Sequence, residues 1–212
     1  MRVVSLELGP FAARCVLLAC EPTGFAAVVD PGFEPEAVIE AVRHEKFRPV
    51  AIVLTHAHLD HAWGVAALKA AFPAAPLMMH ADDLPLYENL PGQATAFGFP
   101  APEVAPAEHL LLDGETLPIG EESLLVRHCP GHSPGHVVLV REHPAEPLAV
   151  VGDVLFAGSV GRTDLWGGSF EQLERSIRHV LYVLPDATRV VPGHGPETTI
   201  GAEKATNPFV PG

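Results

Sequence analysis

Four side chains that can bind metals lie within the six residues 56–61. His56, His58, Asp60 and His61 come directly after the apolar run 50–54. That run predicts a buried strand, and side chains two residues apart on a strand point to the same side, as His56 and His58 would. Asp60 and His61 follow where the chain is expected to turn into a helix. Because imidazole nitrogens and carboxylate oxygens suit Zn, Fe or Mn, the segment predicts a metal site.

Three later polar residues also follow strand-like runs. His132 comes after the run 124–127, Asp153 after 148–151, and His194 after 189–191, each with Gly or Pro beside it. Ligands in open α/β sheets gather at the carboxyl ends of strands. Glycine lets the backbone approach a site closely. Residues far apart in the chain are therefore expected to meet at one site.

These motifs, in this order over residues 56–194, resemble the metallo-β-lactamase superfamily, whose pattern is HxHxDH, a later His, a Gly-Asp and a Pro-Gly-His. Within that superfamily the chain is most similar to small glyoxalase II-like hydrolases. The segments that carry this narrower similarity are 131–136, 161–164, 192–201 and 206–209. The resemblance implies an α/β fold, an αββα sandwich of the metallo-β-lactamase type, with the site along one edge. We expect a single domain over residues 1–212.

The resemblance also implies a binuclear metal site. The ligands of one ion would be His56, His58 and His132, those of the other ion would be Asp60, His61 and His194, and the bridging carboxylate would be Asp153. A bridging carboxylate and hydroxide reduce the repulsion between two dications about 3.5–4 Å apart, and metal binding lowers the pKa of water from 15.7 toward ~7. We therefore expect Asp60 and Asp153 to be the catalytic carboxylates. The expected cofactors are two divalent ions, with zinc ahead of iron or manganese.

Other residues are expected to support the site or bind substrate. His136 and Asp30 are predicted to support the metal ligands without binding a metal themselves. Packing is the alternative for His136. Arg162 and Lys204 are candidates for holding a substrate carboxylate. The alternative for Arg162 is an ion pair with Asp164 that holds a loop.

Residues 91–106 contain four prolines and two glycines and show little periodicity. We predict an exposed loop there, and long irregular loops in compact domains are often functional. Phe97 and Phe99 would then face the acyl part of a substrate. A plain connecting loop is the alternative.

The leading interpretation is a hydrolase of thioesters such as S-lactoylglutathione. A persulfide dioxygenase is an alternative, because enzymes of that kind also resemble this chain and use one iron held by the equivalents of His56, His132 and Asp153. Those enzymes typically carry Cys where this chain has His136, which favours the hydrolase. A lactonase or another ester hydrolase would use the same site.

The composition of the chain limits the classes of binding partner that we expect. The net charge of −13 disfavours nucleic acid, whose phosphates are bound by Lys and Arg. No apolar run reaches the ~18 residues that suggest a membrane span, and the N-terminus lacks the shape of a signal peptide. We expect a cytoplasmic enzyme with a small-molecule thioester substrate, and its oligomeric state stays open. Cys15 and Cys20 are expected in the core, and Cys129 is either a packing residue or an oxidisable thiol.

Hydrophobic periodicity predicts the elements that position these residues. The predicted helices are 35–46, 61–72, 81–88 and 170–184, and the last has an apolar stripe and a capping box at Ser169 and Gln172. The predicted strands are 3–8, 15–20, 25–29, 50–54 and 76–79, followed by strand after strand over residues 110–151.

Overall fold

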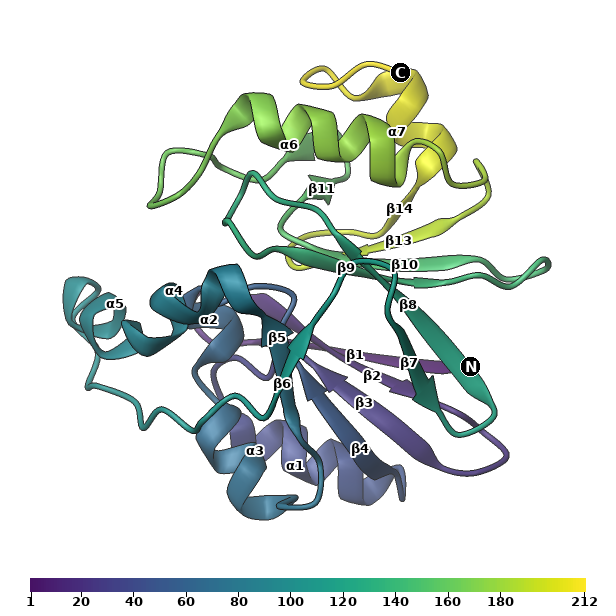
Figure 1. Ribbon diagram of the computed structural model, residues 1–212. Helices are drawn as coiled ribbons and strands as arrows, with labels where there is room; N and C mark the ends of the chain where they lie inside the picture. The colour runs from purple at the N-terminus through teal and green to yellow at the C-terminus, as the bar shows by residue number, and fades with distance from the viewer. The chain divides into compact units, whose positions relative to one another are not determined.

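The computed structural model describes residues 1–212, which form two compact units (Figure 1). The first unit comprises Met1–Leu111 and Pro118–Ser123, and the second comprises Leu112–Leu117 and Leu124–Gly212. Each unit contains most of one six-stranded sheet. The single domain expected over residues 1–212 stays a prediction.

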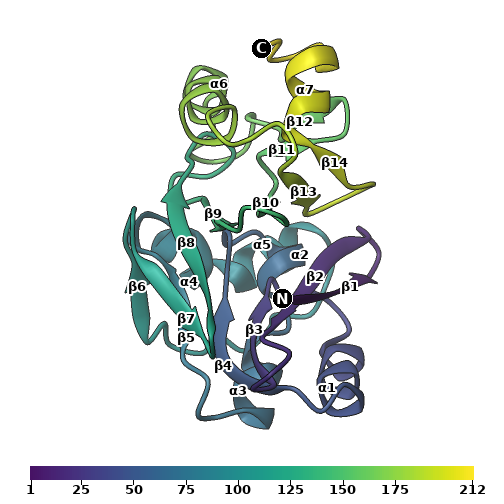
Figure 2. The same ribbon diagram turned by 90° about the vertical axis from the view of Figure 1, so that its right-hand side faces the viewer.

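The sheet of the first unit has the order β1-β2-β3-β4-β5-β6. The strands β1 to β3 pair antiparallel, and β3 to β6 pair parallel (Figures 1 and 2). Every residue of β2 is buried, which is why this strand, apart from Arg14, consists of apolar residues rather than alternating apolar and polar ones. The strands are β1 (Arg2–Leu8), β2 (Ala13–Ala19), β3 (Phe25–Val29), β4 (Arg48–Val53), β5 (Leu77–His80) and β6 (His109–Leu111).

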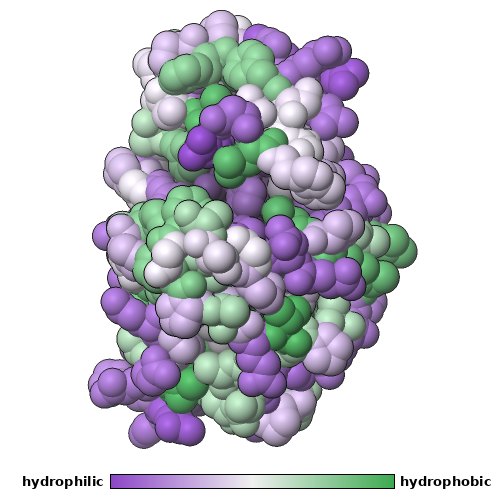
Figure 3. Space-filling model, turned by 90° about the vertical axis from the view of Figure 1, so that its left-hand side faces the viewer, coloured by the Kyte–Doolittle hydropathy of each residue, from purple (hydrophilic) through white to green (hydrophobic).

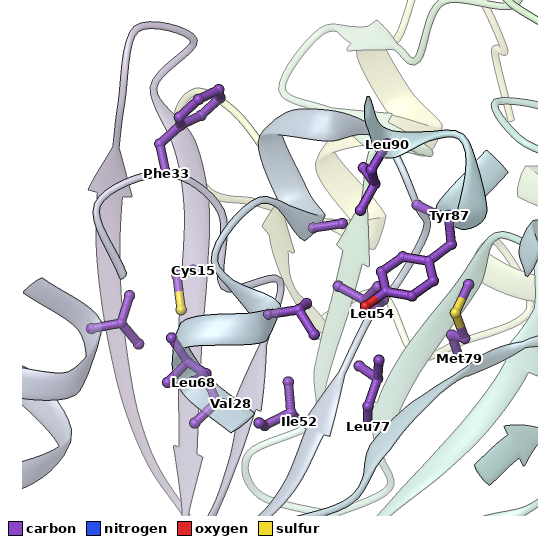
Figure 4. Packing of buried hydrophobic residues seen from close by; sticks show 14 of the residues in the cluster. Cys15, Val28, Phe33, Ile52, Leu54, Leu68, Leu77, Met79, Tyr87 and Leu90 are labelled. Atoms are coloured by element: carbon purple, nitrogen blue, oxygen red, sulfur yellow. The ribbon is translucent and has the colours of Figure 1, made fainter. Parts of the chain in front are cut away.

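The helices of the first unit pack their apolar residues against this sheet. Figure 4 shows Val28 and Ile52 of the sheet close to Leu68 of a helix, and Leu54 and Leu77 close to Tyr87. Burying such side chains contributes roughly 1.5–3 kcal/mol each. The helices are α1 (Pro35–His44), α2 (Leu59–Ala62), α3 (Val65–Ala71), the short 3-10 turn η1 (Ala81–Asp83), α4 (Leu84–Glu88) and α5 (Leu90–Ala96).

The sheet of the second unit has the order β14-β13-β10-β9-β8-β7. The pair β10 and β13 is parallel, and the neighbouring pairs β8–β9, β9–β10 and β13–β14 are antiparallel. The strands are β7 (Thr116–Ile119), β8 (Glu122–His128), β9 (Val137–Arg141), β10 (Leu148–Gly152), β13 (Arg189–Pro192) and β14 (Thr198–Thr199), with β11 (Leu155–Phe156) and β12 (Ser159–Val160) forming a separate small hairpin.

Helix α6 (Phe170–Ser176), the π-helical turn η2 (Ile177–Leu181) and α7 (Ile200–Thr206) belong to the second unit. Leu173, Ile177 and Leu181 from the predicted apolar stripe are buried in its core, whereas Phe170 of that stripe is exposed. The hydroxyl of Ser169 accepts a hydrogen bond from the backbone N–H of Gln172, so the predicted N-cap is confirmed.

Two of the predicted secondary-structure assignments were wrong. The segment 91–106 is not a loop throughout, because α5 extends to Ala96. Its Pro91 lies in the first helical turn, where no intrahelical N–H is needed. The predicted helix 61–72 is split into α2 and α3 near Gly64, whose N–H donates to the carbonyl of Pro31 at 2.8 Å.

None of the helices combines the length and the apolar character needed to cross a bilayer.

On the face drawn in Figure 3, apolar residues form several patches among polar ones.

Candidate metal centre

The first motif lies where β4 ends and α2 begins. The ring of His56 is 4.8 Å from that of His58 and 4.2 Å from that of His61, measured between centroids. All three histidines are buried. The Nε2 atom of His61 is 3.7 Å from Oδ2 of Asp60. The first unit therefore brings together the four predicted ligands of the first motif.

Asp30 and Thr55 form hydrogen bonds with Nδ1 of two of these histidines, His56 and His61. The Thr55 hydroxyl donates to Oδ2 of Asp30 at 2.6 Å and lies 3.0 Å from Nδ1 of His56. Since the hydroxyl has given its only proton to Asp30, it accepts from Nδ1–H of His56. Nδ1 of His61 lies 3.1 Å from the same carboxylate oxygen. In both rings the proton is thus on Nδ1. Nε2 is then the nitrogen whose lone pair is available to bind a metal.

Two side chains outside the motif fix its backbone. A carboxylate oxygen of the buried Asp83 accepts from the N–H of Ala57 at 3.0 Å. The Gln93 amide accepts from the N–H of Leu59 at 3.0 Å and donates to the carbonyl of Ala57 at 3.1 Å. Thr55, Asp83 and Gln93 were not predicted from the sequence. Thr55 adjoins the motif, but nothing in the pattern around Asp83 or Gln93 indicates these contacts.

Asp153 is the centre of the second group of donors. Its Oδ2 lies 3.6 Å from Nε2 of His132 and 3.5 Å from Nε2 of His194. Asp153 follows β10, His194 follows β13, and His132 lies between β8 and β9. The second unit therefore places both predicted histidine ligands from this part of the chain next to the carboxylate of the third predicted ligand, Asp153.

Backbone groups orient His132. Its Nδ1 is 2.8 Å from the carbonyl oxygen of Arg162, which accepts the Nδ1 proton. Gly161, which precedes Arg162, lies so close to the Asp153 carbonyl that a Cβ atom there would overlap it. In the first unit, a Cβ atom on Gly32 would overlap the carbonyl of Asp60 in the same way. Both glycines permit a close approach that no side chain would allow.

His136 contacts the backbone next to the carboxylate. Its fully buried ring accepts the backbone N–H of Asp153 at Nε2, at 3.1 Å. His136 thus contacts Asp153 through the main chain, and the supporting role expected for it stays a prediction.

The two cationic candidates for substrate binding have protein partners. Arg162 makes two hydrogen bonds of 2.7 Å to the carboxylate of Asp164. The Arg162 guanidinium lowers the pKa of Asp164 to about 2. Lys204 donates to Asp186 at 2.7 Å. The alternative considered for Arg162 is therefore what the structure contains.

Phe97 and Phe99 differ in their surroundings. The side chain of Phe97 is 58% exposed, whereas Phe99 is partly buried against the core of the first unit. Cys129 is fully buried, and burial raises the pKa of its thiol to about 12. A thiol of that kind is a packing residue and not a reactive one.

The donor sets fit divalent first-row metals. Each contains imidazole nitrogens and carboxylate oxygens, the combination that zinc, iron and manganese accept. His56, His61 and His132 each have a partner at Nδ1, as metal-binding histidines usually do.

Comparisons with known proteins show which family this chain resembles. The model of the metallo-beta-lactamase superfamily matches residues 8–194. The hydroxyacylglutathione hydrolase GloC of Haemophilus influenzae is 36% identical over 211 residues, which cover 99% of this chain and 98% of that protein.

Solved structures are similar over the whole chain. The BLEG-1 B3 metallo-beta-lactamase has a TM-score of 0.91 and 39% identity and covers 100% of both chains. The protein TTHA1623, in a di-iron-bound form, has a TM-score of 0.86 and 42% identity, and the match covers 98% of this chain and 100% of that one. The chain therefore belongs to the metallo-β-lactamase superfamily, and the predicted α/β sandwich of that family is confirmed.

Proposed function

We propose that this protein is a binuclear metal-dependent hydrolase that cleaves thioesters of the S-lactoylglutathione type. The observation that carries the proposal is the end-to-end similarity to hydroxyacylglutathione hydrolase GloC, in a chain that has every residue of the metal motif. A second support for two bound ions is the similar protein TTHA1623, whose structure was determined in a di-iron-bound form.

The ligand assignment is part of this proposal. In it, Asp153 would serve as a ligand of both ions, and Asp60 would help to hold the second. The remaining ligands are His56, His58 and His132 for the first ion, and His61 and His194 for the second. Zinc is the proposed metal, with iron and manganese as the alternatives that the same donors accept.

The chain's own residues would position the reacting groups. Bound divalent ions would supply a hydroxide at neutral pH and a Lewis acid for the thioester carbonyl. Asp30 and Thr55 keep His56 and His61 in the tautomer that offers Nε2. His136 holds the backbone of Asp153, so that the carboxylate is presented in one orientation. No Ser or Cys nucleophile is needed.

Hydrolysis of a β-lactam is a second candidate function. The observation that favours it is the similarity to BLEG-1, which is named a B3 metallo-beta-lactamase. A β-lactam and a thioester each offer an activated carbonyl to the hydroxide that bound ions would supply, so that the two reactions would differ in substrate binding more than in chemistry.

A substitution at Asp60 tests the hydrolase proposal. We expect Asp60→Ala to halve the metal content and to lower thioesterase activity by at least about a hundredfold, because losing one Lewis acid costs several kcal/mol of transition-state stabilisation and ~1.4 kcal/mol is tenfold in rate. The measurements are metal analysis and hydrolysis of S-lactoylglutathione. Exposed Glu171, paired only with Arg175, gives the control variant Glu171→Ala.

The assay includes a cephalosporin and O2 uptake with glutathione persulfide. A wild-type protein that contains one iron, consumes O2 with the persulfide and leaves the thioester intact would be an oxygenase. Faster cleavage of the cephalosporin than of any thioester would favour the β-lactamase function.

A further inference from the structure

Five aromatic rings from separate segments of the first unit form one cluster. The ring of Phe33 stacks on Trp63 at 4.7 Å and lies 5.1 Å from Phe99. Phe11, from the turn between β1 and β2, lies 6.0 Å from Phe33 and packs edge-on against Phe97 at 5.4 Å. We call Phe11, Phe33, Trp63, Phe97 and Phe99 the aromatic platform. The sequence analysis had identified only Phe97 and Phe99.

The platform has a buried base and an exposed surface. Phe33 is 7% exposed, and Trp63 and Phe99 are partly buried against the core. Phe11 is 37% exposed and Phe97 is 58% exposed. Two large apolar rings in edge-to-face contact are thus presented to solvent on a packed aromatic base. Exposed aromatic side chains that adjoin one another are typical of binding surfaces.

Backbone contacts position the two segments that carry the outer rings, Phe11 and Phe97. Gly9 has a φ of +66°, and a Cβ atom there would overlap Phe33, so the β1–β2 turn can lie directly on this ring. The N–H of Ala12 closes the turn onto the carbonyl of Gly9 at 3.1 Å. On the other side, the N–H of Phe99 donates to the carbonyl of Ala94 at 2.9 Å, which ties the residues after α5 to the helix. The backbone that carries this surface therefore loses little conformational freedom when a ligand binds.

The platform adjoins the first group of metal donors. Trp63 follows His61 by two residues. Phe33 follows Gly32, which lies against the carbonyl of Asp60. The donors and the base of the platform are therefore parts of one packed backbone assembly within the first unit.

From this arrangement we infer that the platform binds the acyl part of the substrate, and that this acyl group is large and apolar or aromatic. The inference rests on the proposed thioesterase function and names its substrate class. Apart from one indole N–H, the five side chains offer only ring faces and apolar edges. A lactoyl group, with one methyl and a hydroxyl, would cover little of such a surface, whereas a phenyl group would contact it across a whole ring.

Two thioesters that differ only at this point test the inference. (R)-mandeloylglutathione is (R)-lactoylglutathione with a phenyl group in place of the methyl group. We expect the metal-loaded wild-type enzyme to prefer the mandeloyl substrate in kcat/KM by at least about tenfold, the discrimination that an apolar pocket can supply. In Phe11→Ala and Phe97→Ala this preference should fall by at least about threefold, mainly through a higher KM for the mandeloyl substrate.

Phe209→Ala is the matched control, because Phe209 is also an exposed phenylalanine, at 52%, but belongs to the second unit. Its substrate preference should equal that of the wild type. Equal kcat/KM values for the two thioesters in the wild type, or an unchanged preference in both platform variants, would overturn the inference.

If neither thioester is cleaved, the proposed function fails, and binding still tests the platform. S-benzylglutathione should then bind the metal-loaded protein at least about tenfold more tightly than S-methylglutathione in calorimetry, with the difference reduced in Phe97→Ala. Equal dissociation constants would exclude a ligand-binding platform.

Discussion

The hydrogen bonds at Nδ1 of His56 and His61 decide which ring nitrogen of each histidine is available to a metal. The Thr55 hydroxyl connects Asp30 to His56, while Asp30 contacts His61 directly. One buried carboxylate thus sets the tautomer of two predicted ligands. Partners of this kind matter nearly as much to a metal site as the ligands themselves.

Replacing Thr55 tests this chain of hydrogen bonds. Thr55→Val keeps the shape of the side chain but removes the hydroxyl, so His56 loses the acceptor for its Nδ1 proton. We expect metal affinity to fall by about 10–100-fold, as measured by titration with a competing chelator. Thr55→Ser keeps the hydroxyl and should restore most of the affinity. Wild-type affinity in the valine variant, with unchanged thermal unfolding, would rule out this role.

The sequence indicated the residues that could bind metal, because their types and spacing are local. It did not indicate what holds them. Asp83 and Gln93 contact residues 57 and 59 from 26 to 36 positions away in the chain. Such contacts depend on how β5, α4 and α5 pack, and packing leaves no signature in a short motif. The same reason explains why the pairing of Lys204 with Asp186 was not foreseen.

At the scale of elements, helix α7 stabilises the hairpin that leads to the second group of donors. The buried carboxylate of Glu203 accepts from the N–H of Gly158 at 2.9 Å, from the hydroxyl of Thr198 at 2.6 Å and from the Asn207 amide at 2.8 Å. Asn207 also donates to the carbonyl of Ser159 at 3.0 Å. Glu203 and Asn207 together fix the β11–β12 hairpin, and residues 161 and 162 follow directly after it.

Removing this carboxylate should destabilise the protein strongly. Glu203→Ala removes the acceptor of the buried Asn207 amide and of two part-buried donors, Gly158 N–H and the Thr198 hydroxyl, which we expect to lower the free energy of unfolding by about 2–4 kcal/mol. Urea denaturation measures the change. Glu171→Ala removes a carboxylate that is 82% exposed and should change the stability by less than about 0.5 kcal/mol. If both variants were equally stable, the hydrogen bonds of Glu203 would contribute no net stability.

Periodicity predicted the long elements better than their interruptions. The strands β1 to β5 and helix α1 lie within a few residues of their predicted bounds. The break between α2 and α3 depends on a tertiary hydrogen bond from Gly64 to Pro31, and the π-helical turn at Ile177–Leu181 also lay outside any sequence signal. The residue types of Pro91 and Gly92 favour a loop, so the sequence does not indicate the start of α5, although proline is tolerated in a first helical turn.

At the scale of the whole molecule, the core contains ionisable groups that stay protonated when folded. Burial raises the pKa of the Cys129 thiol to about 12 and raises that of Cys15 further above its ordinary range. The pKa of Tyr182 is raised to about 12 and that of Tyr87 is raised as well, both chiefly by burial. In the unfolded chain, thiols ionise near pH 8.5 and tyrosines near pH 10.

The protein should therefore lose stability in alkali. A group with a folded-state pKa above its unfolded value stabilises the fold fully below the unfolded pKa, and this contribution is lost as the pH rises toward the folded pKa. For Cys15 and Cys129 together, we expect the free energy of unfolding to drop by about 3 kcal/mol between pH 8.5 and pH 10. Urea denaturation at several pH values measures the slope. Cys129→Ala should reduce it by about half, and a stability that does not change over this range would contradict the prediction.

The order of the motifs sufficed to predict the family, because the family is defined by residues that recur at the ends of successive strands. The resemblance to the superfamily implied two strand-rich halves, but the residues at which the chain divides into two compact units were not predicted. This division depends on how many contacts residues make within each half of the chain, and the hydrophobic pattern alone does not report this.

Gly32 and Gly161 lie against the carbonyls of Asp60 and Asp153, at places where a single added carbon atom would overlap the main chain. Neither glycine offers a group that can bind a metal or move a proton. In a library that replaces each residue in turn, both positions should nevertheless reject substitution as strictly as the ligands do. A reader of such data would count them among the catalytic residues, although what they supply is the absence of an atom.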